Sequence, residues 1–272
     1  MILAGILLKL GGYGMLRLSL PIFPEASFYF APYVFFLSIV AILYTSLVAL
    51  VQKDVKKLIA YSSIAHMGFV TLGMFTVTAL GINGSIFQMI SHGLVSAGLF
   101  FCVGVVYERF HTRVIAHYGG LAAKMPRYAT LFLILTMASI GVPGTSGFLG
   151  EFFVILGTFS IAPMWAVLAA LGVIFSAAYG LLLYRRMMFD KLNTEHLSLK
   201  NMFDLKASEM SVLLLLTVPA ILFGLYPKPI TELISPYTEH LMAHVHKKTQ
   251  DTHSGSAYMS STSTHRGGSH DA

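Results

Sequence analysis

The sequence is poor in charge and nearly without cysteine. Only 11% of its 272 residues are Asp, Glu, Lys or Arg, whereas a soluble domain carries about 25%. The single cysteine, Cys102, lies inside an apolar run, which excludes an intramolecular disulfide framework and any Cys-based zinc or iron–sulfur site within the chain. Hydrophobic residues make up 56% of the chain, and the mean hydropathy is +0.73. This composition predicts a membrane protein.

Signatures of soluble enzymes and of nucleic-acid binding are also lacking. We find no soluble domain, no nucleotide-binding loop and no Ser/His/Asp-type arrangement, so catalysis on an organic substrate has no support. The net charge of +6 does not indicate nucleic acid, because the 18 Lys and Arg residues fall in short clusters between apolar stretches. The apolar start of the chain is not a signal peptide, which would carry its positive charge before the apolar region.

Seven segments are long and apolar enough, or nearly so, to cross a membrane, which takes about 20 residues of helix. The fifth is too long for one straight span and contains the interruption GVPGTSG at 141–147, which predicts two half-helices around an unwound stretch. The seventh is short and contains Pro219. The predicted fold class is therefore an all-α, polytopic transmembrane helix bundle, with a membrane domain over 1–227 and its broken helix at 129–160. The segments are 1–18, 33–51, 58–77, 85–106, 129–159, 163–184 and 210–226.

Basic residues are distributed unevenly between the predicted loops. If the segments alternate across the bilayer, one side receives twelve Lys and Arg residues, while the other receives Arg17, two short loops without basic residues and the C-terminal tail. By the positive-inside rule the first side is the cytoplasm or the mitochondrial matrix, which places the tail on the opposite face. The twelve are Lys53, Lys56, Lys57, Arg109, Arg113, Lys124, Arg127, Arg185, Arg186, Lys191, Lys200 and Lys206.

The end of the chain, residues 228–272, is predicted to be a polar tail. Beyond His240 it is rich in Ser, Thr, Gly and His, so we expect it to be disordered or to lie on a partner. Its histidines could bind a metal, but a solvated low-complexity tail is favoured because no Cys or carboxylate constellation accompanies them. These histidines are His240, His244, His246, His253, His265 and His270.

Four ionisable residues stand out well inside the predicted spans: Lys9, His66, His92 and Glu151. Such a side chain costs roughly 2.5 to 3.5 kcal/mol at mid-membrane on insertion scales, so each requires a reason. From the helical rise, His66 lies about 12 Å and His92 about 20 Å from the basic side. Glu151 follows the break and is expected nearer the far surface. We therefore expect the four to be spread through the membrane thickness as a proton relay, for which histidine is suited because it exchanges protons near neutral pH.

Each of the four also has a purely structural explanation. Lys9 could snorkel to the surface, the histidines could bond Ser or backbone groups, and Glu151 could cap the second half-helix. A shared pathway is favoured, because four independent explanations are less economical in a chain with so little charge in its spans. Glu108, Arg109, His111 and Arg113 are expected to form only a solvated loop network. Polar residues at helical spacing and the hinge residues of the break are expected to support the path: Tyr13, Ser62, Gln88, Ser96, Pro143 and Gly144.

Several blocks of sequence, in order, resemble the chain 4 family of proton-pumping NADH:ubiquinone oxidoreductase, respiratory complex I, a family of antiporter-like subunits. The resemblance covers roughly residues 1–227 and corresponds to the family's second half, helices eight to fourteen. The fold of that family has fourteen transmembrane helices with two inverted five-helix repeats. The blocks are ILAGILLKLGGYGMLR at 2–17, KLIAYSSIAHMG at 57–68, MISHGL at 89–94, YERFHTR at 107–113 and GVPGTSGFLGEF at 141–152.

The resemblance implies specific roles for the four ionisable residues. Lys9 corresponds to the central lysine of the hydrophilic axis, His66 and His92 to the bridging histidines, and Glu151 to the terminal carboxylate on the broken helix. The glutamate and lysine of the family's first half have no counterpart here. We therefore expect a split subunit, whose N-terminal half is a separate polypeptide packed against residues 1–18, with a sequence fragment as the alternative.

The resemblance also implies partners, cofactors and a location. The partners would be the N-terminal half, membrane lipids and other membrane-arm subunits, including neighbouring antiporter-like chains. NADH, FMN, iron–sulfur clusters and ubiquinone would be bound by other subunits. The location would be the mitochondrial inner membrane, with the C-terminus on the intermembrane-space side, or a bacterial plasma membrane.

The leading functional hypothesis is a proton-translocating subunit of this NADH:ubiquinone reductase that carries no redox centre itself. Two alternatives are a subunit of a secondary cation/proton antiporter and a structural subunit that has lost transport. The four retained ionisable residues count against the structural alternative, because a scaffold is more stable with apolar residues in their place.

Overall fold

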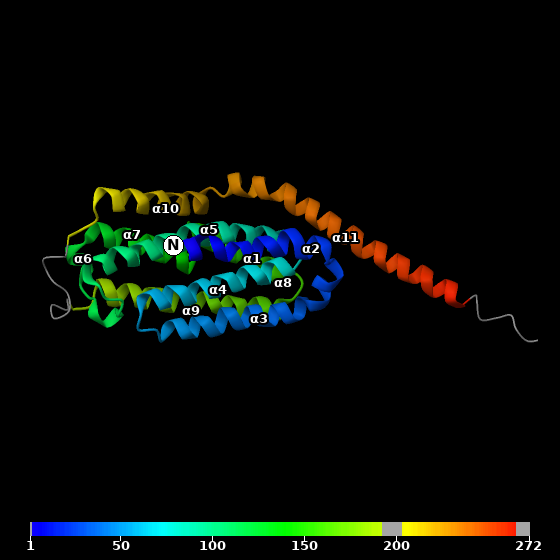
Figure 1. Ribbon diagram of the computed structural model, residues 1–272, viewed down its shortest axis with the longest axis horizontal. Coiled ribbons are helices and arrows are strands. Elements are labelled where there is room, and N and C mark those ends of the chain that lie inside the picture. Colours follow the sequence, from blue (N-terminus) through cyan, green and yellow to red (C-terminus); the bar gives the residue numbers. More distant parts are fainter. Residues whose placement is uncertain (1, 192–202, 265–272) are drawn as a thin grey trace, which may run out of the picture.

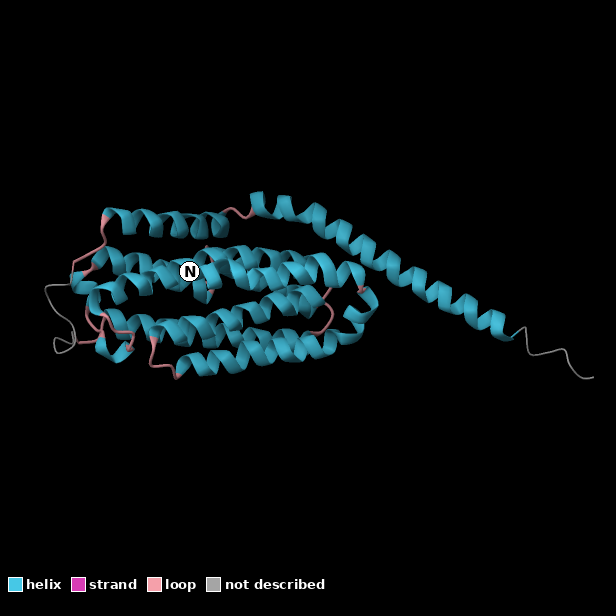
Figure 2. Ribbon diagram, in the orientation of Figure 1, coloured by secondary structure: helices cyan, strands magenta, loops and turns pink. Residues whose placement is uncertain are grey.

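The computed structural model of the chain describes the backbone of residues 2–191 and 203–264, and all side chains within them except those of residue 246 and residues 249–264. Lys200, His265 and His270 lie outside the described residues, and so do the side chains of His246 and His253. Throughout the described part the regular elements are helices, and most of them run along the long axis of a single bundle (Figures 1 and 2). The predicted all-α class is confirmed.

The first membrane span consists of four short helical pieces that follow one another without a break. They are η1 (Leu3–Leu7), α1 (Leu8–Gly14), η2 (Met15–Ser19) and α2 (Leu20–Ile22), and the two η pieces are π-helical. The remaining elements are α3 (Pro24–Leu50), α4 (Val55–Phe75), α5 (Ala79–Phe110), the short η3 (Ile115–His117) and α6 (Leu121–Lys124), α7 (Pro126–Ile140), α8 (Ser146–Phe159), α9 (Pro163–Met188), α10 (Ala207–Leu225) and α11 (Lys228–Thr264).

Among the described residues, six helical stretches are long and apolar enough to cross a membrane, and α7 and α8, which occupy the fifth predicted segment, are shorter apolar helices. The predicted spans have the right order but were drawn too short. The second span begins at Pro24 instead of residue 33, because Pro24 and Glu25 favour a helix start although they interrupt the apolar run. The fourth span, α5, has 32 residues and extends beyond the predicted 85–106 at both ends. Polar residues at its ends interrupt the apolar run but do not stop the helix.

The predicted break in the fifth span is present between α7 and α8. Gly141 and Gly144 adopt φ values of +80° and +91°, which side-chain-bearing residues rarely reach. The chain folds back at this point, so that the first turn of α8 lies beside the last turn of α7. Gly147 is so close to the carbonyl group of Ala138 that an added Cβ would overlap it. Glycine is therefore required both for the turn and for the close approach.

Small residues also bring α5 and α8 together, as is common between membrane helices. An added Cβ at Gly84 would lie 2.7 Å from the backbone nitrogen of Val154, and one at Gly157 would lie 2.5 Å from that of Gly81. The same pair of helices meets again at Gly150, which packs on Gln88. These contacts bring the second half-helix close to α5, where it reaches the ionisable residues of the core.

The basic end of the bundle contains a buried ion pair that the sequence analysis missed. Arg109 is 5% exposed and its Nη2 donates to Glu209 Oε2 at 2.6 Å, which corrects the prediction that it belongs to a solvated loop network. Asp204 accepts from the backbone N–H groups of Arg127 and Tyr128 at the start of α7. These contacts tie α10 to α5 and α7. The sequence could not identify this burial, because Arg109 lies at a helix end and its partner, Glu209, is 100 residues away in the chain.

Helix α11 differs from the predicted disordered tail. It crosses the far end of the bundle beside α2 and extends beyond it (Figure 1). Leu241 and Val245 are buried, and Tyr237 donates its hydroxyl to the carbonyl of Leu16 at 3.0 Å. The prediction of disorder beyond His240 is therefore wrong for this part of the tail. Its apolar residues recur at intervals of three and four, which gives a helix one apolar face without any long apolar run.

Candidate functional site

Lys9 and His92 form the first contact of the candidate site. Lys9 Nζ lies 2.7 Å from His92 Nδ1 and donates to the carbonyl oxygen of Ala4 at 2.5 Å. The first span and α5 approach closely at Gly93, where an added Cβ would lie 3.1 Å from the carbonyl oxygen of Gly5 in η1. Lys9 follows the π-helical turn η1, a feature often found at functional sites. The lysine is thus held to the core and does not snorkel to the surface.

His66 and Glu151 form the second contact. His66 Nδ1 lies 2.7 Å from Glu151 Oε1, and Gln88 Nε2 donates to the same oxygen at 3.1 Å. His66 and Glu151 are 4% and 3% exposed. Glu151 lies in the second turn of α8 and bonds side chains of α4 and α5, so the structure contradicts its interpretation as a helix cap. A buried carboxyl with two donors is satisfied within the protein.

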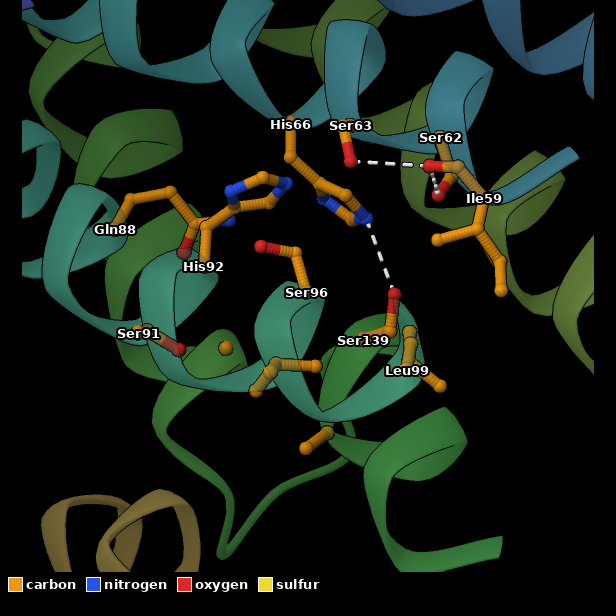
Figure 3. A pocket seen from close by; sticks show the side chains of 13 residues that line it. Ile59, Ser62, Ser63, His66, Gln88, Ser91, His92, Ser96, Leu99 and Ser139 are labelled. Carbon is orange, nitrogen blue, oxygen red and sulfur yellow. Dashed lines mark hydrogen bonds between the residues drawn. The ribbon is translucent and has the colours of Figure 1, made fainter. Parts of the chain in front are cut away.

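The two contacts are joined by the imidazole rings. The ring centroids of His66 and His92 lie 5.5 Å apart, and both rings face a small polar cavity together with serine side chains (Figure 3). The cavity has a volume of about 10 Å³, which is about the space that the centre of one water molecule needs. His92 Nε2 is buried at this cavity without a hydrogen-bond partner among the described residues. The four ionisable side chains therefore form one continuous line, Lys9–His92–His66–Glu151.

The contacts correct the prediction that Glu151 lies nearer the far surface than the histidines. Direct contacts of 2.7 Å place Lys9 beside His92 and Glu151 beside His66. The predicted depths failed for two reasons. α4 and α5 each begin before the apolar run used to count the rise. In addition, the chain folds back at the break, which returns Glu151 to the level of the end of α7 instead of carrying it to the far surface.

The predicted supporting residues have mixed outcomes. Gln88 contacts Glu151, while Ser62 and Ser96 line the polar cavity. Ser62 donates to Ile59 O at 2.9 Å, and Ser96 donates to the Ala4 carbonyl at 3.4 Å. Pro143 and Gly144 lie in the turn between α7 and α8. Tyr13 is 60% exposed on the outer face of the first span and is not brought to the line.

Three further groups around the line were missed by the sequence analysis. Ser139 Oγ and Tyr179 Oη lie 3.3 and 3.5 Å from His66 Nε2, and Ser91 shares a hydrogen bond of 2.7 Å with Ser146. Serine and tyrosine are too frequent in spans to mark a site on their own. Ser91 lies next to His92 in the chain, and that adjacency was the only signal. Among the described side chains, no group of three or more His, Cys, Asp or Glu residues is arranged to hold a metal ion.

These features define a class of protein: a multi-pass α-helical membrane protein with a broken helix and a buried line of ionisable side chains. The chain belongs to the NADH:quinone oxidoreductase/Mrp antiporter transmembrane family, which it matches over residues 1–176. The resemblance to antiporter-like subunits of complex I is confirmed at the level of the family.

Individual relatives agree with this assignment. NADH-quinone oxidoreductase subunit M of Rhodobacter capsulatus is 53% identical over 245 residues, which are 90% of this chain and 48% of that protein. NADH-ubiquinone oxidoreductase chain 4 of Marchantia polymorpha is 49% identical over 243 residues, 89% of this chain and 49% of that protein. In the solved structure of respiratory complex I from Thermus thermophilus with bound NADH, one chain matches with a TM-score of 0.82 and 34% identity, covering 88% of this chain and 50% of that one. The chain spans about half the length of the curated relatives it matches.

Proposed function

We propose that this chain translocates protons along the line Lys9–His92–His66–Glu151, as part of the membrane arm of an NADH:quinone oxidoreductase of the respiratory complex I type. The observation that carries the proposal is the line itself, in which each ionisable group contacts or faces the next within the bundle. Ionisable residues buried in a membrane are costly and rare, and they usually mark ion or proton pathways. The family and the named relatives support the same function.

The two imidazoles are oriented so that each can pass a proton through its ring. His92 presents Nδ1 to Lys9 and Nε2 to the polar cavity, while His66 presents Nδ1 to Glu151 and Nε2 to the hydroxyl groups of Ser139 and Tyr179. A neutral imidazole accepts a proton on one nitrogen and releases another from its second nitrogen. A proton given by Lys9 to His92 Nδ1 can therefore leave from Nε2, and one released by His66 Nδ1 arrives on Glu151 Oε1. Between the rings, the proton would pass through the water-sized cavity, whose lining includes both histidines and Ser139, the partner of His66 Nε2.

The driving force would come from outside this chain. Charges interact strongly in a site shielded from water, so a change of charge near one end of the line changes the free energy of protonation along it. In the proposed complex, electron transfer from NADH to ubiquinone supplies that change. NADH, FMN, the iron–sulfur clusters and ubiquinone are then bound by other subunits, and this chain contributes only proton-carrying side chains.

The exposed face of the first span supports a protein neighbour there. Ile2, Leu3, Ile6 and Leu10 are 57% to 71% exposed. We propose that the helices equivalent to the first half of the relatives cover this face, and that other antiporter-like subunits and lipids surround the bundle. The location would be a mitochondrial inner membrane or a bacterial plasma membrane, with the basic end inside and the C-terminus on the intermembrane-space or periplasmic face.

The test is mutation of both ends of the line within the assembled complex. Glu151→Gln and Lys9→Ala should each lower the number of protons pumped per NADH oxidised, because each removes a proton-carrying group. The matched control is Glu232→Gln in the exposed Lys228–Glu232 pair, which should leave pumping unchanged. Pumping and quinone reductase activity are measured together in proteoliposomes. Wild-type pumping in both line variants would refute the proposal and favour a scaffold.

A secondary cation/proton antiporter is the second candidate, because the matching family also includes Mrp antiporter chains. Such a protein would work from ion gradients without a redox partner. Native gel electrophoresis of solubilised membranes separates the two functions. Comigration of this chain with NADH dehydrogenase activity supports the respiratory complex, whereas a complex that does not reduce dyes with NADH supports the antiporter.

A further inference from the structure

We propose that Gln88 is a positioning residue whose side-chain amide turns over when Glu151 gains or loses its proton. This inference rests on the proposed function, because it concerns how Glu151 exchanges protons within the line. Gln88 is 2% exposed, and it is the amide that contacts the carboxyl group of the site (Figure 3 shows Gln88 beside the histidines).

The present arrangement matches an ionised Glu151. Its Oε1 accepts from Gln88 Nε2 at 3.1 Å and lies 2.7 Å from His66 Nδ1, so two N–H donors converge on one oxygen. Donors directed at a carboxylate stabilise its charged form. If His66 passes its Nδ1 proton to Oε1, the new O–H group first donates back to Nδ1. Once Nδ1 is protonated again, the O–H group has only N–H groups, those of His66 and Gln88, in front of it. Two donors then oppose each other, and that contact becomes unfavourable.

The other end of the amide shows how this conflict is resolved. Gln88 Oε1 is buried and has no hydrogen-bond partner among the described residues. A half-turn of the amide brings this oxygen to Glu151, where it accepts the new O–H group, because the two ends of an amide are nearly equal in size but opposite in hydrogen bonding. The unpaired oxygen is therefore the acceptor that a protonated Glu151 requires.

Gly150 borders the amide and has no side chain to obstruct its rotation. An added Cβ at Gly150 would overlap Gln88 Oε1 and lie 2.8 Å from its Cα and Cβ, so the glycine backbone directly borders the amide. The titratable groups near Glu151 come from three helices: His66 on α4, His92 on α5 and Tyr179 on α9, with Lys9 beyond His92. Gln88 has no charge of its own, so it provides a partner for either state of Glu151 without adding to these charges.

Removal of the amide takes a donor from ionised Glu151 and an acceptor from protonated Glu151. It should still favour the protonated form, because a hydrogen bond to a charged group is stronger than a neutral one, and the difference changes the ratio of protonated to ionised carboxyl by about fivefold to tenfold. Gln88→Met keeps the length and packing of the side chain but has no amide. Gln52→Met is the matched control, because the Gln52 amide donates only to the carbonyl of Val48 at the end of α3, away from the line.

The experiment is infrared difference spectroscopy of the assembled complex, with proton pumping measured on the same samples. The carboxylic-acid band of Glu151 is assigned by its absence in Glu151→Gln. We expect Gln88→Met to raise the ratio of protonated to ionised Glu151 by about fivefold to tenfold, seen as a stronger band in the resting complex, and to lower pumping. Quinone reductase activity and assembly should be retained, and Gln52→Met should be unchanged. Gln88→Asn keeps an amide that is too short to reach and should act like Gln88→Met, which provides a second variant if Gln88→Met fails to assemble.

The outcomes separate the two proposals. The role of Gln88 would be overturned if Glu151→Gln lowers pumping while Gln88→Met and Gln88→Asn both keep wild-type pumping and an unchanged Glu151 band. Gln88 would then only fill space. Wild-type pumping in Glu151→Gln would instead overturn the proposed function of the line itself.

Discussion

The close approach of α8 to α5 at Gly150 leads to a quantitative prediction for Gly150→Ala. The new methyl group would lie 2.8 Å from Gln88 Cα and Cβ, against 3.4–4 Å for ordinary van der Waals contact. The helices would have to separate by about 0.6 Å or more, and overpacking of this kind costs about 1 to 3 kcal/mol. The hydrogen bond from Gln88 Nε2 to Glu151 Oε1 is already 3.1 Å long, so the same movement carries it beyond bonding distance.

The assay measures protons pumped per NADH oxidised in proteoliposomes of the assembled complex, with quinone reductase activity as the internal reference. Gly150→Ala should lower pumping while quinone reduction continues. Gly104→Ala on α5 is the matched control, since no atom lies within 4 Å of its added Cβ. Alanine is favoured over glycine inside a helix by about 0.5 to 1 kcal/mol, so the control should be neutral or slightly stabilising. Unchanged pumping in Gly150→Ala, or equal loss in both variants, would refute the packing argument.

Two further predictions concern stability away from the line. Arg109→Met leaves Glu209 without its ionic partner and should speed amide hydrogen exchange in α10 by about a hundredfold or more, because breaking a buried pair costs about 3 to 5 kcal/mol. The double variant with Glu209→Gln should recover much of this protection; if it exchanges as fast as the single variant, the pair is not the cause. Thr238→Val removes the donor to Asn83 Oδ1 at 2.6 Å and should cost about 1 to 3 kcal/mol, measured as faster hydrogen exchange in α11. Unchanged exchange there would show that packing alone holds α11.

The sequence predicts the features that depend on local polarity and backbone preference. Apolar run length located the spans, and the glycines and Pro143 of the 141–147 turn located the break. Ionisable residues inside apolar runs located the four members of the line. Each of these properties is decided by residues close together in the chain, which is why it could be predicted.

The predictions that were wrong concern properties that depend on contacts between residues far apart in the chain. The depth of Glu151 depends on the fold-back at Gly141, and the burial of Arg109 depends on Glu209. Helical spacing placed Gln88 on the face of His92, at the polar cavity, but the same spacing placed Tyr13 beside Lys9 in the outer groove, because spacing identifies a face without showing what that face contacts. Hydropathy therefore indicates that a polar group is buried and does not identify its partner.

The line connects the first span to α8 by way of α5 and α4, and its two ends differ in their surroundings. Its Glu151 end is enclosed in the bundle, while Lys9 borders a groove of about 780 Å³ between the first span, α5 and α10. The walls of this groove are mainly apolar, and the Lys9 amino group turns from them to the Ala4 carbonyl and His92. Within the described residues, Lys9 is therefore the end of the line that borders the outside of the bundle, whereas Glu151 meets only side chains of the interior.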